Sequence, residues 1–187
     1  AACAAGESFS IGRLSSMVDA SGRTDYCYNR FGDVVRKAQI TNGKTFVVRY
    51  TYTIGGNLAS VIYPDGAVAD YIRDGQGRIT EVGVTSGSSG RQVLLTGASY
   101  LPFGPSTGWQ YGNGRALVRS FDTDYRPTAV VDSGNDLKIG LGYDSVSNIT
   151  ALESGNYAAA LNYDNLGRLT EFRDSAANVA IEQYTYD

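Results

Sequence analysis

A seven-residue segment, Tyr-Asp-Asn-Leu-Gly-Arg-Leu at residues 163–169, recurs in altered copies along the whole chain. Tyr163 ends an extended run, and Asp164 can hydrogen-bond the backbone ahead of it to begin a turn. Gly167 supplies positive φ, and Arg168 opens the next extended run. The segment therefore predicts strand, turn and strand, and its recurrence predicts a repeat protein.

The copies align on the position of Gly167, and we call the residue at that position the anchor of each copy. The anchors are Gly12, Gly32, Gly56, Gly77, Gly104, Tyr125, Ser147 and Gly167. The first four lie 20, 24 and 21 residues apart, and the last three lie 22 and 20 residues apart. In the fullest copies a tyrosine stands four residues before the anchor, at Tyr28, Tyr52, Tyr143 and Tyr163, and Asp144 and Asp164 follow the last two. A period of about 21 residues is typical of repeat architectures.

A second turn lies between successive anchors. Asn42-Gly43, Asp65-Gly66 and Asn113-Gly114 are among these turns, and such dipeptides are the strongest short signals of a β-hairpin. The run at residues 45–52 is rich in β-branched and aromatic residues, so we expect it to form a hairpin with residues 58–63. Each repeat thus has room for two strands and two turns, and the fold class is all-β with tandem β-hairpins.

One array accounts for residues 1–187, with about eight repeats, incomplete at both ends. Residues 85–91 are rich in glycine and serine and interrupt the rhythm, which indicates a loop insertion. The alanine-rich stretch at residues 151–160 is interrupted by Gly155-Asn156, so we interpret it as a hairpin, with a short helical turn as the alternative. Residues 1–10 are small and polar, and we expect no regular structure there.

Composition narrows the functional classes. The chain has 23 glycines, 14 tyrosines, no histidine, a net charge of −3 and a pI near 5.0. The slightly negative net charge does not indicate a basic surface for nucleic acid. No apolar run reaches the roughly 20 residues of a membrane helix. Without histidine the chain lacks the commonest general base and metal ligand, so we predict no enzyme activity, no catalytic residue, no metal and no cofactor.

Two acidic clusters are compatible with calcium, but we favour turn chemistry for both. They are Asp122 with Asp124, and Asp132 with Asp136.

Two cysteines, Cys3 and Cys27, are separated by 24 residues. A disulfide is one alternative, and we expect instead that both remain unpaired thiols.

The repeat resembles the YD-repeat, or Rhs (rearrangement hotspot), family over nearly the whole chain. Residues 163–169 match the family's Tyr-Asp-x-x-Gly-Arg-Leu signature in full, and residues 143–149 are similar to its Asn-Ile variant. The resemblance implies that the repeats form a long curved antiparallel sheet, part of a spiral β-shell. The Asp-Pro-x-Gly motif of the self-cleaving segment found in some members is absent, so that activity is not carried over.

The resemblance also implies a function. Bacterial members are secreted or cell-surface polymorphic toxins whose shell encloses a C-terminal effector, so this chain is expected to be a structural wall segment. Its partners are then the rest of the same polypeptide shell and the enclosed effector domain, without nucleic acid or membrane insertion. An excised segment exposes an edge strand at each end, and we expect it to dimerise by edge pairing. The alternative is an extracellular adhesive module whose tyrosines and Trp109 stack on carbohydrate.

Overall fold

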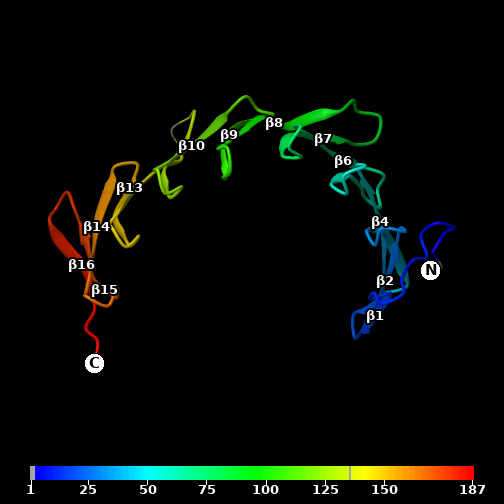
Figure 1. Ribbon diagram of the computed structural model, residues 1–187, viewed down its shortest axis with the longest axis horizontal. Helices are drawn as coiled ribbons and strands as arrows, with labels where there is room; N and C mark the ends of the chain where they lie inside the picture. The colour runs from blue at the N-terminus through cyan, green and yellow to red at the C-terminus, as the bar shows by residue number, and fades with distance from the viewer. Residues whose placement is uncertain (1–2, 135) are drawn as a thin grey trace. The chain divides into compact units, whose positions relative to one another are not determined.

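The computed structural model describes residues 3–134 and 136–187, and within them the chain is built of strands joined by turns and loops (Figure 1). The first eight strands are β1 Ser16–Asp19, β2 Gly22–Tyr28, β3 Val34–Thr41, β4 Lys44–Tyr52, β5 Leu58–Ile62, β6 Val68–Arg73, β7 Ile79–Thr85 and β8 Gln92–Tyr100. The next eight are β9 Ser106–Tyr111, β10 Ala116–Phe121, β11 Pro127–Asp132, β12 Lys138–Tyr143, β13 Ile149–Ser154, β14 Tyr157–Tyr163, β15 Leu169–Asp174 and β16 Val179–Gln183. The all-β prediction is confirmed.

The sixteen strands form one open sheet whose spatial order is their order in the sequence. The neighbouring strand pairs whose register is described are all antiparallel. Strand pairing is therefore local in sequence, since each strand is joined to its partner by a short turn. Two compact units are distinguished along the chain, Ala1–Thr96 and Gly97–Asp187, and the boundary falls inside β8.

The predicted turns and strands are placed as the residues indicate. The expected strand at 45–52 corresponds to β4, and it pairs with β5 through Tyr50 and Val61. Asn42 and Gly43 both have positive φ, 48° and 71°, as an Asn-Gly hairpin turn requires. The stretch at residues 151–160 is a hairpin, in which β13 pairs with β14. The connection between β7 and β8 covers residues 86–91, where the sequence predicts an insertion.

The first residues of the described chain form no helix or strand, as expected, but they are held on the sheet. Ser8 forms a parallel bridge with Tyr28, whose backbone N–H donates to the Glu7 carbonyl oxygen at 2.9 Å. Glu7 also accepts from the Arg49 guanidinium on β4 at 2.8 Å. Backbone bonds to β2 and an ion pair to β4 thus hold this segment, although its composition gives no strand signal.

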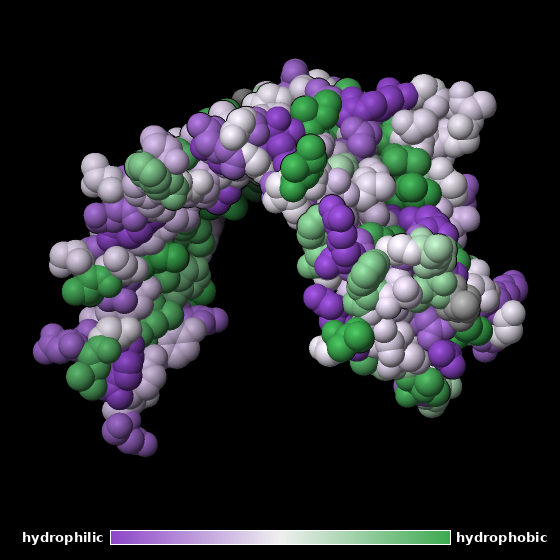
Figure 2. All heavy atoms as spheres, turned by 45° about the vertical axis from the view of Figure 1, so that its right-hand side comes forward, coloured by the Kyte–Doolittle hydropathy of each residue, from purple (hydrophilic) through white to green (hydrophobic). Residues whose placement is uncertain are grey.

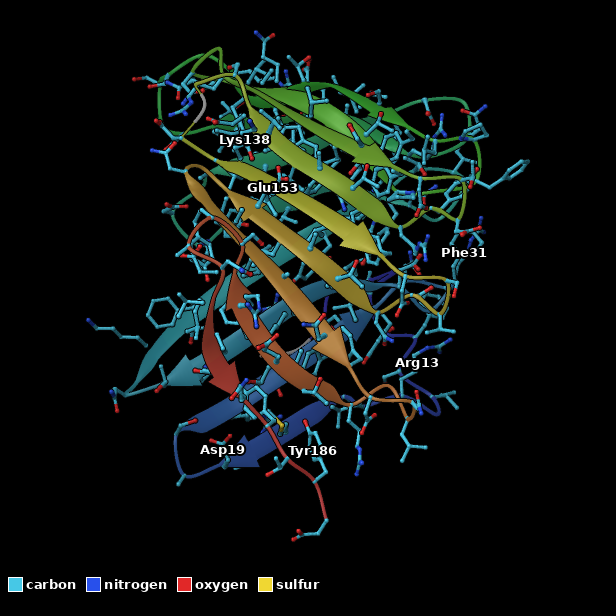
Figure 3. All side chains as sticks on the ribbon, turned by 90° about the vertical axis from the view of Figure 1, so that its left-hand side faces the viewer. Arg13, Asp19, Phe31, Lys138, Glu153 and Tyr186 are labelled. Carbon is cyan, nitrogen blue, oxygen red and sulfur yellow. A yellow bond between two sulfur atoms is a disulfide. The ribbon has the colours of Figure 1, made fainter. Side chains whose placement is uncertain are left out.

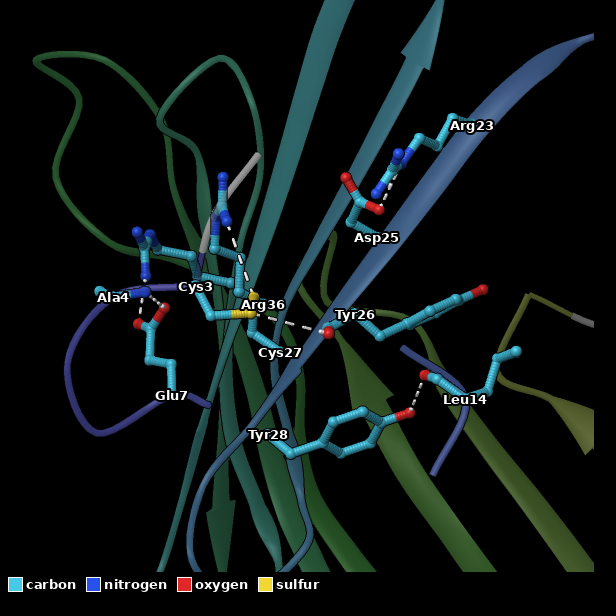
Figure 4. Close-up of a disulfide and its surroundings, with 11 residues drawn as sticks. Cys3, Ala4, Glu7, Leu14, Arg23, Asp25, Tyr26, Cys27, Tyr28 and Arg36 are labelled. Carbon is cyan, nitrogen blue, oxygen red and sulfur yellow. Dashed lines mark hydrogen bonds and ion pairs between the residues drawn. A yellow bond between two sulfur atoms is a disulfide. The ribbon is translucent and has the colours of Figure 1, made fainter. Parts of the chain in front are cut away.

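The expectation of two free thiols is wrong, because Cys3 and Cys27 form a disulfide (Figure 4). Their Cα atoms are 5.6 Å apart, a normal separation for this bond. Cys27 is only 1% exposed, and the Arg36 guanidinium lies 3.7 Å from its sulfur. The parallel bridge between Ser8 and Tyr28 brings the two cysteines together, and this bridge cannot be inferred from their spacing alone.

A single layer of strands leaves little room for a core. The buried apolar residues are Cys27, Tyr28, Ala38, Val61, Leu117 and Ala159. Most other strand residues are half-buried, because side chains on one face of a sheet contact their neighbours on the same face. Hydrophobic side chains consequently reach the surface in both units, as the green atoms of Figure 2 show.

Candidate functional site: the repeated anchor turn

The most regular feature of the structure is a five-residue hairpin loop that we call the anchor turn. At residues 164–168, the Asp164 N–H donates to the Arg168 carbonyl oxygen at 2.9 Å, and the Gly167 N–H donates to the Asp164 carbonyl oxygen at 3.0 Å. This is a type I turn followed by one left-handed residue, a common way to close a hairpin. The same two backbone bonds occur in the turns at residues 29–33, 53–57, 74–78, 101–105, 122–126 and 144–148.

The anchor residue supplies the left-handed conformation in all but one of the predicted copies. The φ angles are 73° at Gly12, 94° at Gly32, 75° at Gly56, 80° at Gly77, 63° at Tyr125, 72° at Ser147 and 74° at Gly167. Tyr125 and Ser147 therefore occupy a conformation that L-residues adopt at a cost of roughly 1–2 kcal/mol.

Gly104 differs from the other anchors. Its turn keeps the two backbone bonds, but its φ lies outside the left-handed region. The ring of Tyr125, the next anchor along the chain, lies so close that a Cβ on Gly104 would come within 2.4 Å of it. Glycine is required here for the close approach of an aromatic ring.

The aspartate of the motif closes the turn with its side chain. Asp164 accepts from the backbone N–H groups of Leu166 and Arg168 through Oδ1, each at 2.9 Å. Its Oδ2 accepts from Arg168 Nε at 2.7 Å. Asp74 and Asp122 form the same three bonds with their own turns, Asp122 through Arg126 Nε at 2.7 Å. The acidic and basic residues of the motif are thus joined within one turn.

Two further copies keep the geometry with different chemical groups. Asp144 pairs with Asn148, whose Nδ2 donates to the carboxylate at 2.9 Å. At residues 29–33 the order is reversed, since Asn29 Nδ2 donates to Asp33 Oδ2 at 2.9 Å and Asn29 Oδ1 accepts from the backbone. These turns pair one donor with one acceptor four residues apart, in either order. The turn at residues 101–105 keeps the two backbone bonds without such a pair.

The anchor tyrosines connect successive repeats. Tyr163 lies at the end of β14, and its hydroxyl donates to the carbonyl oxygen of Ile149, the first residue of β13, at 2.8 Å. The same link joins Tyr28 to Leu14, Tyr52 to Val34, Tyr143 to Pro127 and Tyr186 to Leu169, at 2.7 to 2.9 Å. Each acceptor lies two residues after the preceding anchor, so every tyrosine ties its repeat to the anchor turn before it.

Arg73 occupies the tyrosine position of its copy and makes an equivalent bond. Its Nη2 donates to the Leu58 carbonyl oxygen at 3.0 Å, and its Nη1 donates to the Gly77 carbonyl oxygen at 2.8 Å. Leu58 stands two residues after Gly56, as the other acceptors stand after their anchors. Arginine and tyrosine thus share a long side chain with a terminal hydrogen-bond donor at this position. Phe121 occupies the same position in its copy and has no such donor.

The arginine of the motif also reaches the next repeat. The guanidinium carbon of Arg126 lies 4.8 Å from the ring centroid of Tyr143, and that of Arg168 lies 4.5 Å from Tyr186. Both distances are within the range of a cation–π contact. Each tyrosine of these pairs thus contacts the preceding anchor turn through its ring and its hydroxyl.

Hydrogen bonds to the carboxylates favour their charged form. The backbone N–H of Arg168 is the main cause that lowers the pKa of Asp164 below its ordinary value, and the Arg168 side chain acts in the same direction. The pKa values of Asp74, Asp122 and Asp144 are lowered as well, although desolvation, the largest single effect there, opposes the hydrogen bonds. On β15, the pKa of Glu171 is lowered to about 2, chiefly by a hydrogen bond from the Arg173 side chain and further by Asn162 and Gln183.

The acidic clusters that are compatible with calcium are engaged with arginines. Asp122 pairs with Arg126, and Arg115 pairs with both Asp132 and Asp136. No group of three or more potential metal ligands gathers among the residues described. In the same parts of the chain, no helix is long and apolar enough to cross a membrane.

No protein-family model and no curated protein matches the sequence. Solved structures do match. The crystal structures of TcdB2-TccC3-Cdc42 and TcdB2-TccC3 both superpose with a TM-score of 0.80, at 15% and 14% identity, over 94% of this chain and 11% of theirs. The chain has the fold of an Rhs/YD-repeat shell.

A Tc holotoxin pore from Photorhabdus luminescens is similar to the YD-repeat sheet as well. It superposes with a TM-score of 0.68 at 12% identity, over 90% of this chain and 12% of the matched chain. The chain therefore spans about a tenth of the length of the shell-containing chains that it matches. At this level of identity the likeness concerns the fold.

Sequence reasoning missed two features of the YD-repeat array. The first is the hydroxyl link from each tyrosine to the preceding turn, because the acceptor is a backbone carbonyl and leaves no mark in the sequence. The second is the exposure of an apolar residue beside several anchors, such as Phe31, Val146 and Leu166, which are 73 to 77% exposed. A signal for the second was present, since an apolar residue directly precedes five of the eight anchors.

Proposed function

We propose that this chain is a structural wall segment of an Rhs/YD-repeat shell that encloses a C-terminal toxin or effector. The observation that supports it most strongly is the inter-repeat link from tyrosine hydroxyl to backbone carbonyl, with Tyr163 and Ile149 as the example. Such links stabilise a single-layer sheet that has almost no core. A wall of this kind separates two compartments with one thickness of sheet.

The repeat anchors are assigned a structural role on the same grounds. Gly12, Gly32, Gly56, Gly77, Tyr125, Ser147 and Gly167 close the turns through a left-handed residue, and Gly104 admits the Tyr125 ring. Tyr28, Tyr52, Tyr143 and Tyr163 join repeats, while Asp144, Asp164 and Arg168 close their own turns. These side chains are engaged in intramolecular bonds, which supports a non-enzymatic function.

The partners follow from the enclosing role. They are the rest of the same polypeptide shell and the effector domain inside it, in a bacterial protein that is secreted or displayed at the cell surface. The similarity to chains of TcdB2-TccC3 and of a Tc holotoxin supports this assignment. The disulfide between Cys3 and Cys27 is consistent with an oxidising, extracellular environment.

The adhesive module is the weaker candidate. Carbohydrate stacking needs free aromatic faces, whereas the ring of Tyr143 is stacked by Arg126 and that of Tyr186 by Arg168. Trp109 is half-buried and makes an edge contact with Tyr111 at 6.0 Å. No observation favours the carbohydrate over these intramolecular contacts.

Limited proteolysis of the longest natural polypeptide that contains these residues tests the proposal. Mass spectrometry follows the segment downstream of Asp187, and cleavage in the exposed loop at residues 86–90 reports that the protease is active. We expect the downstream segment to survive while the loop is cut. Digestion of both at the same rate would refute enclosure, and a second sample unfolded in urea establishes that the downstream segment contains cleavable sites.

A further inference from the structure

The disulfide joins two cysteines that differ in their surroundings (Figure 4). Cys27 lies within β2 and is 1% exposed, whereas Cys3 lies in the segment before the first strand and is partly exposed. The residues that follow Cys3, at positions 4–6, are all exposed. A thiol from solvent can therefore approach Cys3, while Cys27 is covered.

Arg36 makes Cys27 the better leaving group of the two. The register between β2 and β3 places Arg36 directly opposite Cys27, and Nη1 of Arg36 lies 3.7 Å from the Cys27 sulfur. Arg36 is itself only 9% exposed, so water and salt screen its charge weakly. A guanidinium at this distance stabilises a thiolate, and a more stable thiolate leaves a disulfide faster.

Within the described residues, two backbone bonds hold residues 3–9 on the sheet, and both are made with Tyr28. The Tyr28 N–H donates to the Glu7 carbonyl oxygen at 2.9 Å, and the Phe9 N–H donates to the Tyr28 carbonyl oxygen at 3.2 Å. The ion pair between Glu7 and Arg49 adds little, because the Arg49 side chain is 46% exposed. The disulfide is therefore the strongest constraint on this segment.

The chain after this segment is held separately. The Leu14 carbonyl oxygen accepts from the Tyr28 hydroxyl at 2.7 Å, and the Ser15 carbonyl oxygen accepts from the Tyr26 N–H at 3.0 Å. The guanidinium carbon of Arg13, which is labelled in Figure 3, lies 5.8 Å from the centroid of the Tyr28 ring. Release of residues 3–9 would therefore end before Arg13 and leave β1 in place.

We propose that the Cys3–Cys27 disulfide is a thiol–disulfide exchange site, at which a thiol reductant attacks the Cys3 sulfur and frees residues 3–9 from β2. The attacking thiolate forms a bond to the Cys3 sulfur, the bond between the two cysteines breaks, and Cys27 leaves as a thiolate beside Arg36. A second thiol then attacks the mixed disulfide and releases Cys3. Two thiols of the reductant thereby become one disulfide, and their two electrons pass to the cysteine pair, whose thiolates exchange protons with solvent.

Reduction uncovers the end of a strand. The pairing of β1 with β2 ends at Ser16 and Asp25, and Tyr28 lies beyond it. When residues 7–9 leave, the N–H and carbonyl groups of Tyr28 lose their partners, so this end of β2 becomes an open edge. The first unit thus has a covered edge under oxidising conditions and an open one under reducing conditions. The inference does not rest on the enclosure of an effector.

Reaction with reduced glutathione identifies the sulfur that is attacked. The folded 187-residue chain is treated without urea, quenched with acid at early times, and analysed by peptide mass spectrometry. We expect glutathione on Cys3 and a free thiol at Cys27. Glutathione on Cys27 would overturn the proposal. So would a folded protein that stays oxidised while a urea-unfolded sample is fully reduced.

Hydrogen exchange followed by NMR tests the release of residues 3–9. The amide of Tyr28 loses its acceptor on reduction, whereas the amide of Tyr26 keeps Ser15 and is the matched control. Reduction should accelerate exchange at Tyr28 by at least about 10-fold more than at Tyr26. Equal acceleration at the two amides, or none at either, would overturn the proposal.

The rate of reduction by dithiothreitol tests the role of Arg36. The change Arg36→Gln removes the charge and should slow reduction at least about 3-fold, because Cys27 becomes a poorer leaving group. The change Arg36→Lys keeps a positive charge and should restore most of the rate. Circular dichroism establishes that both variants are folded, and the glutathione experiment on the wild type needs neither of them. Unchanged or faster reduction of the Arg36→Gln protein would overturn the assignment of the leaving group.

Discussion

The hydroxyl of Tyr163 donates a hydrogen bond of 2.8 Å to the carbonyl oxygen of Ile149, at the start of the preceding strand. Ile149 directly follows the anchor turn at residues 144–148, so one side chain joins two repeats. A sheet of one layer cannot rely on a deep core, and these links replace part of the missing packing. The tyrosine of the motif therefore has a role that phenylalanine cannot fill.

The change Tyr163→Phe should lower the free energy of unfolding by about 1 kcal/mol, because it removes one intramolecular hydrogen bond and leaves a carbonyl oxygen unpaired. Urea denaturation followed by circular dichroism measures the change. Tyr157→Phe is the matched control, since Tyr157 lies on the same strand and is 38% exposed. Equal effects of the two changes would show that the hydroxyl link carries no stability.

The change Gly167→Ala should cost about 1–2 kcal/mol, because its φ of 74° is unfavourable for any residue with a Cβ. No atom lies closer than 3.9 Å to the added Cβ, so the cost arises in the backbone. Gly75→Ala serves as the control, since Gly75 has open space around it and no positive φ. Thermal denaturation should distinguish the two, and a stable Gly167→Ala protein would contradict the left-handed turn.

Loss of the disulfide should destabilise the first unit by about 3 kcal/mol, the amount expected when a closed loop of this length is released in the unfolded chain. The double variant Cys3→Ser with Cys27→Ser tests this by urea denaturation. The wild type is measured in parallel, with and without a reductant. The reduced wild type and the double variant should agree. If the wild type shows the same midpoint with and without the reductant, the bond does not constrain the unfolded chain.

Stability should fall at acidic pH. Glu171 has a pKa lowered from 4.5 to about 2 in the folded state, chiefly by the Arg173 side chain, and Asp164 has a lowered pKa as well. A carboxylate whose pKa is lower in the folded state contributes stability that is complete above its unfolded pKa and is lost as the pH falls. For Glu171 this loss spans pH 4.5 to about 2.

Urea midpoints measured across that range provide the test, with Glu171→Gln as the comparison. Glutamine does not titrate, so the variant should be less stable at pH 7 and should lose less stability on acidification than the wild type. A variant with the same pH dependence as the wild type would show that Glu171 does not contribute.

The repeat and the strands were accessible from the sequence because their determinants are local. Gly167 and Asp164 act within one turn, through backbone atoms no more than four residues away. The strand at residues 45–52 is likewise defined by its own side chains and by the Asn42-Gly43 turn. Interactions of this range depend on neighbours in the chain, so a short motif is sufficient to predict them.

Tertiary structure decided the features that join one strand to another. The sulfur of Cys3 reaches Cys27 because residues 7–9 align beside β2, and the Tyr163 hydroxyl reaches Ile149 because the strands pair in one particular register. Gly104 admits the Tyr125 ring for the same reason, across a pair of strands. The sequence by itself therefore determined the repeat, its turns and its all-β class. The disulfide and the links between repeats depend on strand register and side-chain direction, which become defined only when the sheet forms.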